Sequence, residues 1–220
     1  MSTSVEAAIE AIRRGGMIVV VDDEDRENEG DLIVAAECAT PEALAFMVRH
    51  GSGIVCVAME QERLEGLELP LMSEDGSEAM GTAFTLTVDA RHGTSTGVSA
   101  TDRARTIEVL IAADTVPDDL RRPGHVFPLR SKRGGVLERA GHTEAAVDLA
   151  RLAGFEPAGV LCEIVNDDGA MARLPDLRVF AAAHRLPLLS IADLIAHRTA
   201  RETLVRREVT TRLPTPHGDF

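Results

Sequence analysis

The feature that most constrains the fold is an acidic stretch, residues 22–31, which carries seven carboxylates in ten positions. Apolar runs flank it on both sides, at residues 17–21 and 32–36. Because both runs belong in a core, the acids between them must lie close together at the edge of that core. Carboxylates held so close disfavour one another's ionised form unless a cation lies among them. The stretch therefore indicates a bound metal, a cationic partner or shared protons.

Two simpler interpretations of this stretch compete with a binding role. A solvated acidic turn is the commoner fate of a charge run, but Arg26 and Gly30 interrupt the acids and no lysine is interleaved with them. An EF-hand loop needs glycine at its sixth position and glutamate at its twelfth. Counted from Asp23, these positions hold Asn28 and Val34, so the EF-hand is excluded.

Charge and composition narrow the class of partner. The chain has 220 residues, 45% of them hydrophobic, which suffices for one domain with a substantial core. A net charge of −13, with no Trp and no Tyr, argues against nucleic acid and against an anionic membrane. The isolated Cys38, Cys56 and Cys162 suggest neither a disulfide framework nor a structural zinc site, and they fit a reducing cytoplasm. We expect neither an export signal nor a membrane span.

Helical and strand patterns alternate irregularly along the chain, which predicts an α/β fold. We expect a single-domain α–β sandwich in which helices cover both faces of a mixed sheet. Caps at Ser4, Thr40 and Thr101 predict helix starts. The expected helices are residues 5–14, 41–50, one after Thr101, one that starts within residues 139–144, 176–184 and 192–201, with a short one near Glu60. The expected strands are residues 17–21, 32–36, 54–58, 84–88, 126–129, 160–165 and 188–189.

A histidine-bearing helix start is the second candidate for chemistry. His142 lies among Arg139, Gly141 and Thr143, where free backbone N–H groups and the helix dipole favour a small phosphate. Carboxylates with one imidazole suit Mg²⁺ or Mn²⁺ better than zinc. Nucleotide motifs are excluded, because residues 76–82 have Thr82 where a P-loop needs lysine, and residues 51–53 lack the third glycine of a dinucleotide fingerprint.

Six ordered motifs carry a resemblance to a known family. They are residues 22–31, 50–56, 97–103, 122–129, 139–145 and 159–163. Together they resemble 3,4-dihydroxy-2-butanone 4-phosphate synthase of riboflavin biosynthesis, over roughly residues 4–200. The resemblance implies a carbon–carbon lyase that converts D-ribulose 5-phosphate to L-3,4-dihydroxy-2-butanone 4-phosphate and formate, through an enediolate and a skeletal rearrangement. It also implies a cytoplasmic homodimer with two Mg²⁺ or Mn²⁺ ions per site, near the subunit interface.

The same resemblance implies roles for individual residues. Glu27 and His142 match the metal ligands of the family. The catalytic matches are His125, Glu163, Asp31 and Cys56, of which Asp31 and Glu163 are expected to transfer protons. The substrate-binding matches are Arg26, Glu27, Asp31, Asp102, Thr106, Arg139, Gly141, His142, Thr143 and Glu163.

The end of the chain falls outside these motifs. Residues 204–220 resemble the junction to a GTP cyclohydrolase II domain in two-domain riboflavin enzymes. We therefore expect a synthase domain at residues 1–203 and an exposed junction at residues 204–220, without cyclohydrolase activity. Two other functions stay open: a metal-dependent sugar-phosphate isomerase or aldolase, and a non-catalytic cation sensor. The release of formate distinguishes the synthase from both.

Overall fold

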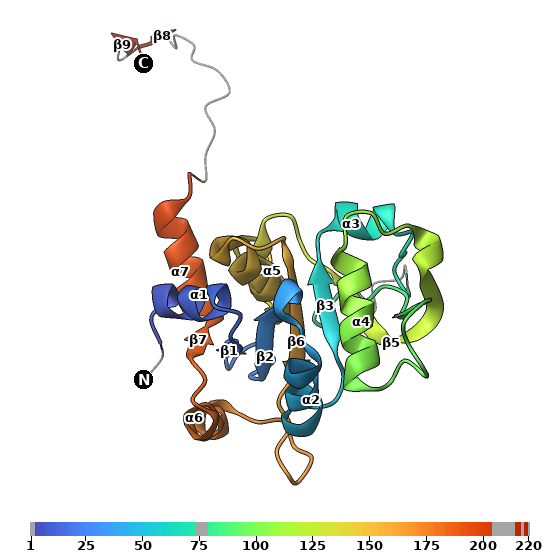
Figure 1. The fold of residues 1–220 in the computed structure, drawn as a ribbon. Helices are drawn as coiled ribbons and strands as arrows, with labels where there is room; N and C mark the ends of the chain where they lie inside the picture. The colour runs from blue at the N-terminus through green and yellow to red at the C-terminus, as the bar shows by residue number, and fades with distance from the viewer. Residues whose placement is uncertain (1–2, 74–78, 204–213, 217, 220) are drawn as a thin grey trace.

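The computed structural model describes residues 3–73, 79–203, 214–216 and 218–219. Within these ranges seven strands form one mixed sheet in the order β4-β5-β3-β6-β2-β1-β7 (Figure 1). Neighbouring strands are antiparallel, except that β1 is parallel to β7 and β3 to β5. The strands are β1 (Ile18–Val21), β2 (Gly30–Ala35), β3 (Cys56–Met59), β4 (Val88–Ala90), β5 (Leu120–Arg130), β6 (Ala158–Glu163) and β7 (Leu188–Ser190), with a separate two-residue pair, β8 (Pro214–Thr215) and β9 (Gly218–Asp219).

Side chains that alternate along the strands divide the core into two layers, one on each face of the sheet. In β1, Ile18 and Val20 enter one layer, and Val19 and Val21 enter the other. The first layer is covered by α1 (Val5–Arg13), α5 (His142–Ala153) and α7 (Ile191–Arg201). The second is covered by α2 (Pro41–His50), α3 (Gln61–Gly66), α4 (Ala100–Ile111) and α6 (Leu174–His184). The predicted fold class, a mixed sheet with helices on both faces, is confirmed.

Helix starts follow local capping chemistry, with one correction. Ser4 accepts a hydrogen bond from the backbone N–H of Ala7, and Thr40 caps α2 with Pro41 in the first turn, as predicted. The prediction that Thr101 caps the next helix is wrong. The cap of α4 is Ser99, whose hydroxyl accepts a hydrogen bond from the Asp102 N–H at 3.0 Å. Thr101 is already inside the first turn. Serine and threonine are both favoured N-cap residues, so the sequence alone did not decide between Ser99 and Thr101.

The region around β4 and β5 differs from the sequence prediction. The predicted strand covers residues 84–88, but β4 covers Val88–Ala90, and Phe84 and Thr85 form only isolated bridges among the described residues. The strand predicted at residues 126–129 begins much earlier, at Leu120. The proline and glycine at positions 123 and 124 are typical of a turn, yet Gly124 lies in β5 against the backbone of Val88, where a Cβ would collide. Glycine therefore permits close strand contact here.

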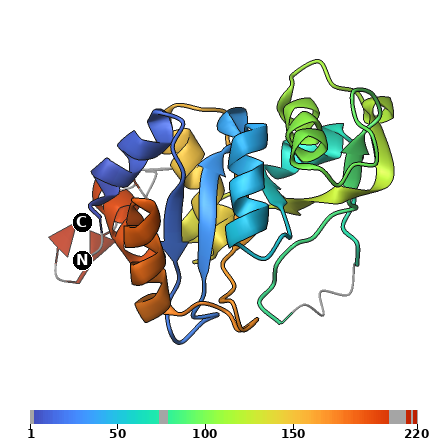
Figure 2. The ribbon, with the colours of Figure 1, turned by 60° about the horizontal axis from the view of Figure 1, so that its bottom comes forward.

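The remaining connections place two parts of the molecule at opposite ends of the sheet. In both views α4 and the β4–β5 edge, coloured green, lie at the opposite end from α1 and α7 (Figures 1 and 2).

The segment between β3 and β4 contains the short helix α3 near Glu60, as predicted. Among the described residues, no helix has the length and apolar character needed to cross a membrane. The expected junction at residues 204–220 lies largely outside the described residues.

Candidate active site

The acidic stretch folds into a loop between β1 and β2 that brings distant acids together. Asp22 accepts a hydrogen bond from the backbone N–H of Glu27 at 3.1 Å. Asp31, the second residue of β2, lies in register with Glu163 at the end of β6. Because side chains at opposed positions of an antiparallel pair share one face, these two carboxylates are neighbours. The sheet thus adds Glu163 to the acids of the loop.

His142, the first residue of α5, lies opposite this loop. Its Nδ1 is 3.6 Å from Glu27 Oε2 and 3.9 Å from Asp31 Oδ1. The N-cap of α5 is Gly141, where a Cβ would collide with the guanidinium of Arg139. Glycine at this position lets the arginine pass across the helix start. The helix N-terminus, an imidazole and a guanidinium therefore converge on the acidic loop.

A cavity of about 410 Å³ lies where these groups meet. Eight of the residues expected from the sequence line it: Arg26, Glu27, Asp31, Cys56, Arg139, His142, Thr143 and Glu163. Gly141 adjoins them in the chain without lining the cavity. Sequence reasoning missed the other lining residues, Glu29, Met80, Thr82, Phe84, Leu129 and Leu161. Glu29 belongs to the acidic stretch, and Leu129 and Leu161 lie within two of the six motifs, whereas Met80 and Phe84 resemble ordinary apolar residues.

Three expected site residues lie outside this cavity in the single chain. His125 Nδ1 is 2.8 Å from Asp89 Oδ2, and the His125 N–H donates to the other Asp89 oxygen at 2.9 Å. Asp102 accepts hydrogen bonds from the N–H and the hydroxyl of Ser95, at 3.0 and 2.7 Å. The Thr106 hydroxyl donates to the Asp102 carbonyl at 2.9 Å. Asp89 and the next residue of β4 connect them, since the Ala90 N–H donates to the Thr106 hydroxyl at 3.0 Å. The three residues thus form a second cluster, on α4 and β5 beside β4.

Burial and mutual charge set the protonation of the groups in the cavity. Burial raises the pKa of Asp31 to about 7, and the neighbouring carboxylates of Glu163 and Glu27 contribute to this rise against the opposing effect of His142. Burial lowers the pKa of His142, but the Asp31 carboxylate and the interaction with Glu27 outweigh it and raise the pKa to about 9. The close His142 imidazole lowers the pKa of Glu27. Without a metal, His142 is therefore protonated near pH 7 and Asp31 is partly protonated. A cation bound at this site would favour loss of these protons.

The thiol of Cys56 has a different character. It lies at the start of β3 on the cavity wall and is almost fully buried. Burial, and then the carboxylates of Glu163 and Asp31, raise its pKa well above the ordinary value of a thiol. Cys56 is therefore a neutral thiol in the cavity wall near pH 7. Only a thiolate is a strong nucleophile, so this thiol is not an activated one.

The donor set fits a hard divalent cation. Asp22, Glu27 and His142 each offer a ligand atom, and these atoms lie within 4.8 Å of one another. His142 Nε2 and Asp31 Oδ1 are buried and make no hydrogen bond to the described residues. Buried polar atoms normally have partners, so such unsatisfied atoms require an explanation. Two carboxylates and one imidazole are ligands that Mg²⁺ and Mn²⁺ accept.

Comparison with known proteins decides the family. Residues 6–197 match the 3,4-dihydroxy-2-butanone 4-phosphate synthase family. The chain belongs to this family. A 3,4-dihydroxy-2-butanone 4-phosphate synthase of Erwinia tasmaniensis is 58% identical over 91% of the chain and 92% of its own length. The crystal structure of a 3,4-dihydroxy-2-butanone 4-phosphate synthase in complex with two magnesium ions superposes with a TM-score of 0.87 and 45% identity, over 90% of this chain and 98% of that one.

Several relatives of the synthase family are longer than this chain. The bifunctional riboflavin biosynthesis protein RIBA 1 of Arabidopsis thaliana is 61% identical over 99% of the chain, which spans 40% of that relative. The riboflavin biosynthesis protein RibBA of Aquifex aeolicus is 57% identical over 99% of the chain, which spans 54% of it. The chain thus corresponds to part of these longer proteins.

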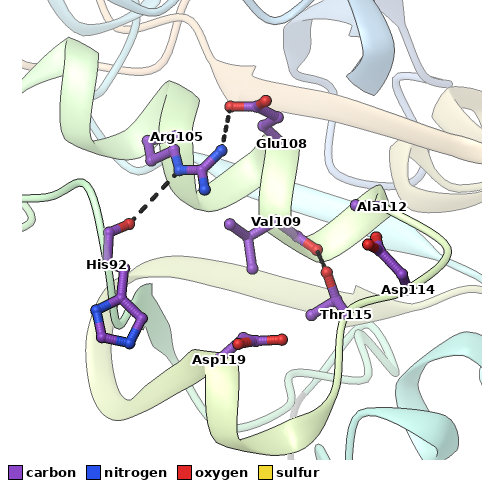
Figure 3. A pocket seen from close by; sticks show the side chains of 8 residues that line it. All are labelled: His92, Arg105, Glu108, Val109, Ala112, Asp114, Thr115 and Asp119. Carbon is purple, nitrogen blue, oxygen red and sulfur yellow. Dashed lines mark hydrogen bonds and ion pairs between the residues drawn. The ribbon is translucent and has the colours of Figure 1, made fainter.

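A second cavity, of about 330 Å³, also contains acids, an arginine and a histidine (Figure 3). It lies beside α4 and is lined by acids such as Glu108, Asp114 and Asp119. Its guanidinium, from Arg105, is paired with Glu108 at 2.7 Å. None of the site residues implied by the resemblance to the synthase family lines this cavity. The position of the expected site residues therefore points to the cavity between the acidic loop and α5.

Proposed function

We propose that this chain is a 3,4-dihydroxy-2-butanone 4-phosphate synthase that converts D-ribulose 5-phosphate to L-3,4-dihydroxy-2-butanone 4-phosphate and formate. The observation that carries the proposal is the meeting of Glu27 and His142, 3.6 Å apart, in a cavity that Asp31 and Glu163 also line. Family membership supports it, as does the match to nearly the full length of the Erwinia tasmaniensis synthase. The enzyme would act as a carbon–carbon lyase in riboflavin biosynthesis.

Glu27 and His142 are assigned to hold the metal. The related synthase was crystallised in complex with two magnesium ions, which supports two Mg²⁺, or Mn²⁺, per site here. When bound, a divalent cation polarises substrate oxygens and stabilises the negative charge that develops on them. Binding requires His142 to release its proton, because only the neutral imidazole has a lone pair to offer.

Proton transfer is assigned to Asp31 and Glu163. With a pKa of about 7, the buried Asp31 carboxylate is suited to take and return a proton near neutral pH. Removal of the C1 proton of the ketose gives an enediolate. Loss of the C3 hydroxyl, a skeletal shift and release of C4 as formate must then occur in a shielded cavity. Cys56 lines the wall as a neutral thiol and supplies shape and shielding.

The phosphate is assigned to the start of α5. The free N–H groups there, with the Thr143 hydroxyl and the Arg139 guanidinium, offer the donors that a phosphate accepts. Gly141 keeps the approach open, since a side chain there would meet Arg139. Arg26 lines the opposite side and balances part of the carboxylate charge through its contact with Asp22 at 2.8 Å.

We infer a homodimer in which a second copy completes the cavity. His125, Asp102 and Thr106 match family site residues but line a different part of the same chain. A partner subunit that brings this second cluster to the acidic loop would explain both facts. His125 would then position the substrate or act as an acid there.

Complementation tests the shared site. His125→Ala and Glu163→Ala should each be inactive as homodimers. Co-expressed, they should form heterodimers in which one of two sites is intact, restoring about a quarter of wild-type activity at random assembly. No gain in activity above the separate variants would contradict a shared site.

The domain organisation and the location are further parts of the proposal. We assign residues 1–203 to the synthase domain and residues 204–220 to a junction that precedes a GTP cyclohydrolase II domain in longer relatives. The name of the bifunctional Arabidopsis thaliana relative supports this assignment. The three free cysteines support a cytoplasmic location, because thiols stay reduced there.

The decisive experiment is a product assay. The protein is incubated with D-ribulose 5-phosphate and Mg²⁺, with and without a chelator, and formate and the four-carbon phosphate are quantified. We expect both products in equal amounts, and neither with the chelator. Glu163→Ala should bind the substrate without turning it over. Formation of a five-carbon isomer without formate would instead identify an isomerase, and metal binding without any product would identify a cation sensor.

A further inference from the structure

The first acid of the stretch, Asp22, has an environment unlike that of the others. It follows β1 directly, and its carboxylate is completely buried, with 0% of the side chain exposed. Oδ2 accepts hydrogen bonds from Arg26 Nη1 at 2.8 Å and from the Glu27 N–H at 3.1 Å, and Oδ1 accepts one from the Glu29 N–H at 2.9 Å. Three donors, one of them cationic, compensate the cost of burying the charge.

These bonds fix the backbone on both sides of the loop. The Asp22 N–H donates to the Glu29 carbonyl at 3.3 Å, so the two residues close the loop with hydrogen bonds in both directions. Asn28, between the two bonded N–H groups, adopts a left-handed conformation with φ of 55°. The carbonyl of Glu27 is held in turn by Arg173 Nη1 at 2.8 Å. The loop is therefore wrapped around one buried carboxylate.

Glu27 is held directly by this arrangement, and its Oε1 also contacts Arg26 Nη2 at 2.9 Å. Its N–H is bonded to Asp22 and its carbonyl to Arg173, which leaves the side chain directed at His142. Backbone fixed at both ends restricts the orientations that the Glu27 carboxylate can sample. A ligand held in place before the cation arrives binds it more tightly, because less conformational entropy is lost on binding.

We propose that Asp22 is a positioning residue that organises the acidic loop and presents Glu27 to His142 before any cation binds. This inference rests on the proposed function only for the metal that Glu27 and His142 would hold. The alternative is that Asp22 is itself a third ligand, since its ligand atom lies within 4.8 Å of theirs. Its two oxygens already accept three hydrogen bonds, which favours the positioning role.

The test compares Asp22→Asn and Asp22→Ala with the wild type in two measurements on the whole chain. In the metal-free protein, amide hydrogen exchange at Glu27 and Glu29, followed residue by residue by NMR, should become at least about tenfold faster in Asp22→Ala. Asp22→Asn should lie between, because its amide keeps one accepting oxygen. In the second measurement, Mg²⁺ affinity by calorimetry should fall about 10- to 100-fold in Asp22→Ala.

Asp148→Asn is the matched control, because Asp148 is a buried carboxylate that accepts bonds from the Val136 N–H and Arg198, away from the loop. It should change neither loop exchange nor Mg²⁺ affinity. Weaker Mg²⁺ binding with unchanged loop exchange in both Asp22 variants would identify a direct ligand and overturn the inference. Unchanged affinity despite faster exchange would overturn it too. If the wild type binds no Mg²⁺, the proposed metal site fails, while loop exchange still decides whether Asp22 organises the loop.

Discussion

Asp31 on β2 and Glu163 on β6 occupy opposed positions of one antiparallel pair, and both line the same cavity. The pairing places the Glu163 carboxylate beside that of Asp31, whose Oδ1 is 3.9 Å from the imidazole Nδ1 of His142, and Asp31 is buried. Burial and like charge raise the pKa of Asp31 to about 7, and the acids raise that of His142 to about 9. Proton uptake, metal binding and stability are thereby linked through these groups.

Mg²⁺ affinity should increase steeply with pH. A cation that binds His142 must displace its proton, so affinity grows about tenfold per pH unit below the pKa of about 9. Calorimetric titrations at pH 7 and pH 8 should therefore differ by about tenfold. A histidine of ordinary pKa, about 6.5, would be mostly neutral over this interval and would give a change of less than about twofold. Nearly equal affinities at the two pH values would contradict the raised pKa of His142.

Without metal, the stability of the fold should decrease as the pH rises. The folded pKa of His142 is raised, so its contribution is fully present below about 6.5 and is lost as pH rises through about 9. For His142 the loss is on the order of 3 kcal/mol. Asp31, also raised, adds a loss in the same direction between about pH 4 and pH 7. Urea unfolding in the presence of a chelator at pH 6 and pH 9 measures the loss from His142 together with the last part of the loss from Asp31.

Asp31→Asn is the control for this pH dependence. The substitution removes the carboxylate whose charge contributes most to raising the pKa of His142, and it removes the titration of Asp31 itself. The difference in unfolding free energy between pH 6 and pH 9 should then shrink markedly. An equally large difference in Asp31→Asn would assign the effect to other groups.

Periodicity and capping predicted most of the fold because these signals are local. The helix start at Ser4 and the strands around the acidic stretch follow from neighbouring residues alone. The β4–β5 region was not predictable in this way, because Gly124 there serves a contact with Val88, far away in the sequence. Likewise the pairing of Asp31 with Glu163 depends on strand order, which no single stretch encodes. The family resemblance supplied the site partners that local physical patterns did not.

Glu144 should support both stability and the proposed phosphate site. Its buried carboxylate accepts a hydrogen bond from Arg139 Nη1 at 2.6 Å and another from the Lys132 N–H at 3.0 Å. Glu144→Gln removes the charge and leaves the guanidinium without its carboxylate partner, which should cost about 2–4 kcal/mol in unfolding free energy. Inorganic phosphate should also bind more weakly, because Arg139 loses its carboxylate partner at the helix start and keeps only its bonds to Thr82 and the Met80 carbonyl. Calorimetric titration and denaturant unfolding measure the two effects.

Glu138→Gln is the matched control, since Glu138 is exposed and accepts a backbone hydrogen bond from the Gly134 N–H at 2.9 Å. Its effect on stability should stay within about 0.5 kcal/mol. Similar losses in the two variants would show that burial of the Glu144 carboxylate is energetically unimportant.

The close contact between β4 and β5 gives a test of the fold itself. A Cβ at Gly124 would collide with the backbone of Val88 and Asp89, and backbone atoms cannot move aside as the end of a flexible side chain can. Gly124→Ala should therefore reduce the unfolding free energy by at least about 2 kcal/mol. It should also disturb His125, which is bonded to Asp89.

Gly66→Ala is the control variant. Gly66 lies at the end of α3, and a methyl group added there would meet no other part of the chain within 4 Å. The substitution should be neutral or stabilising by up to about 1 kcal/mol. Denaturant unfolding of both variants measures the difference, and equal stabilities would refute the contact between Gly124 and Val88.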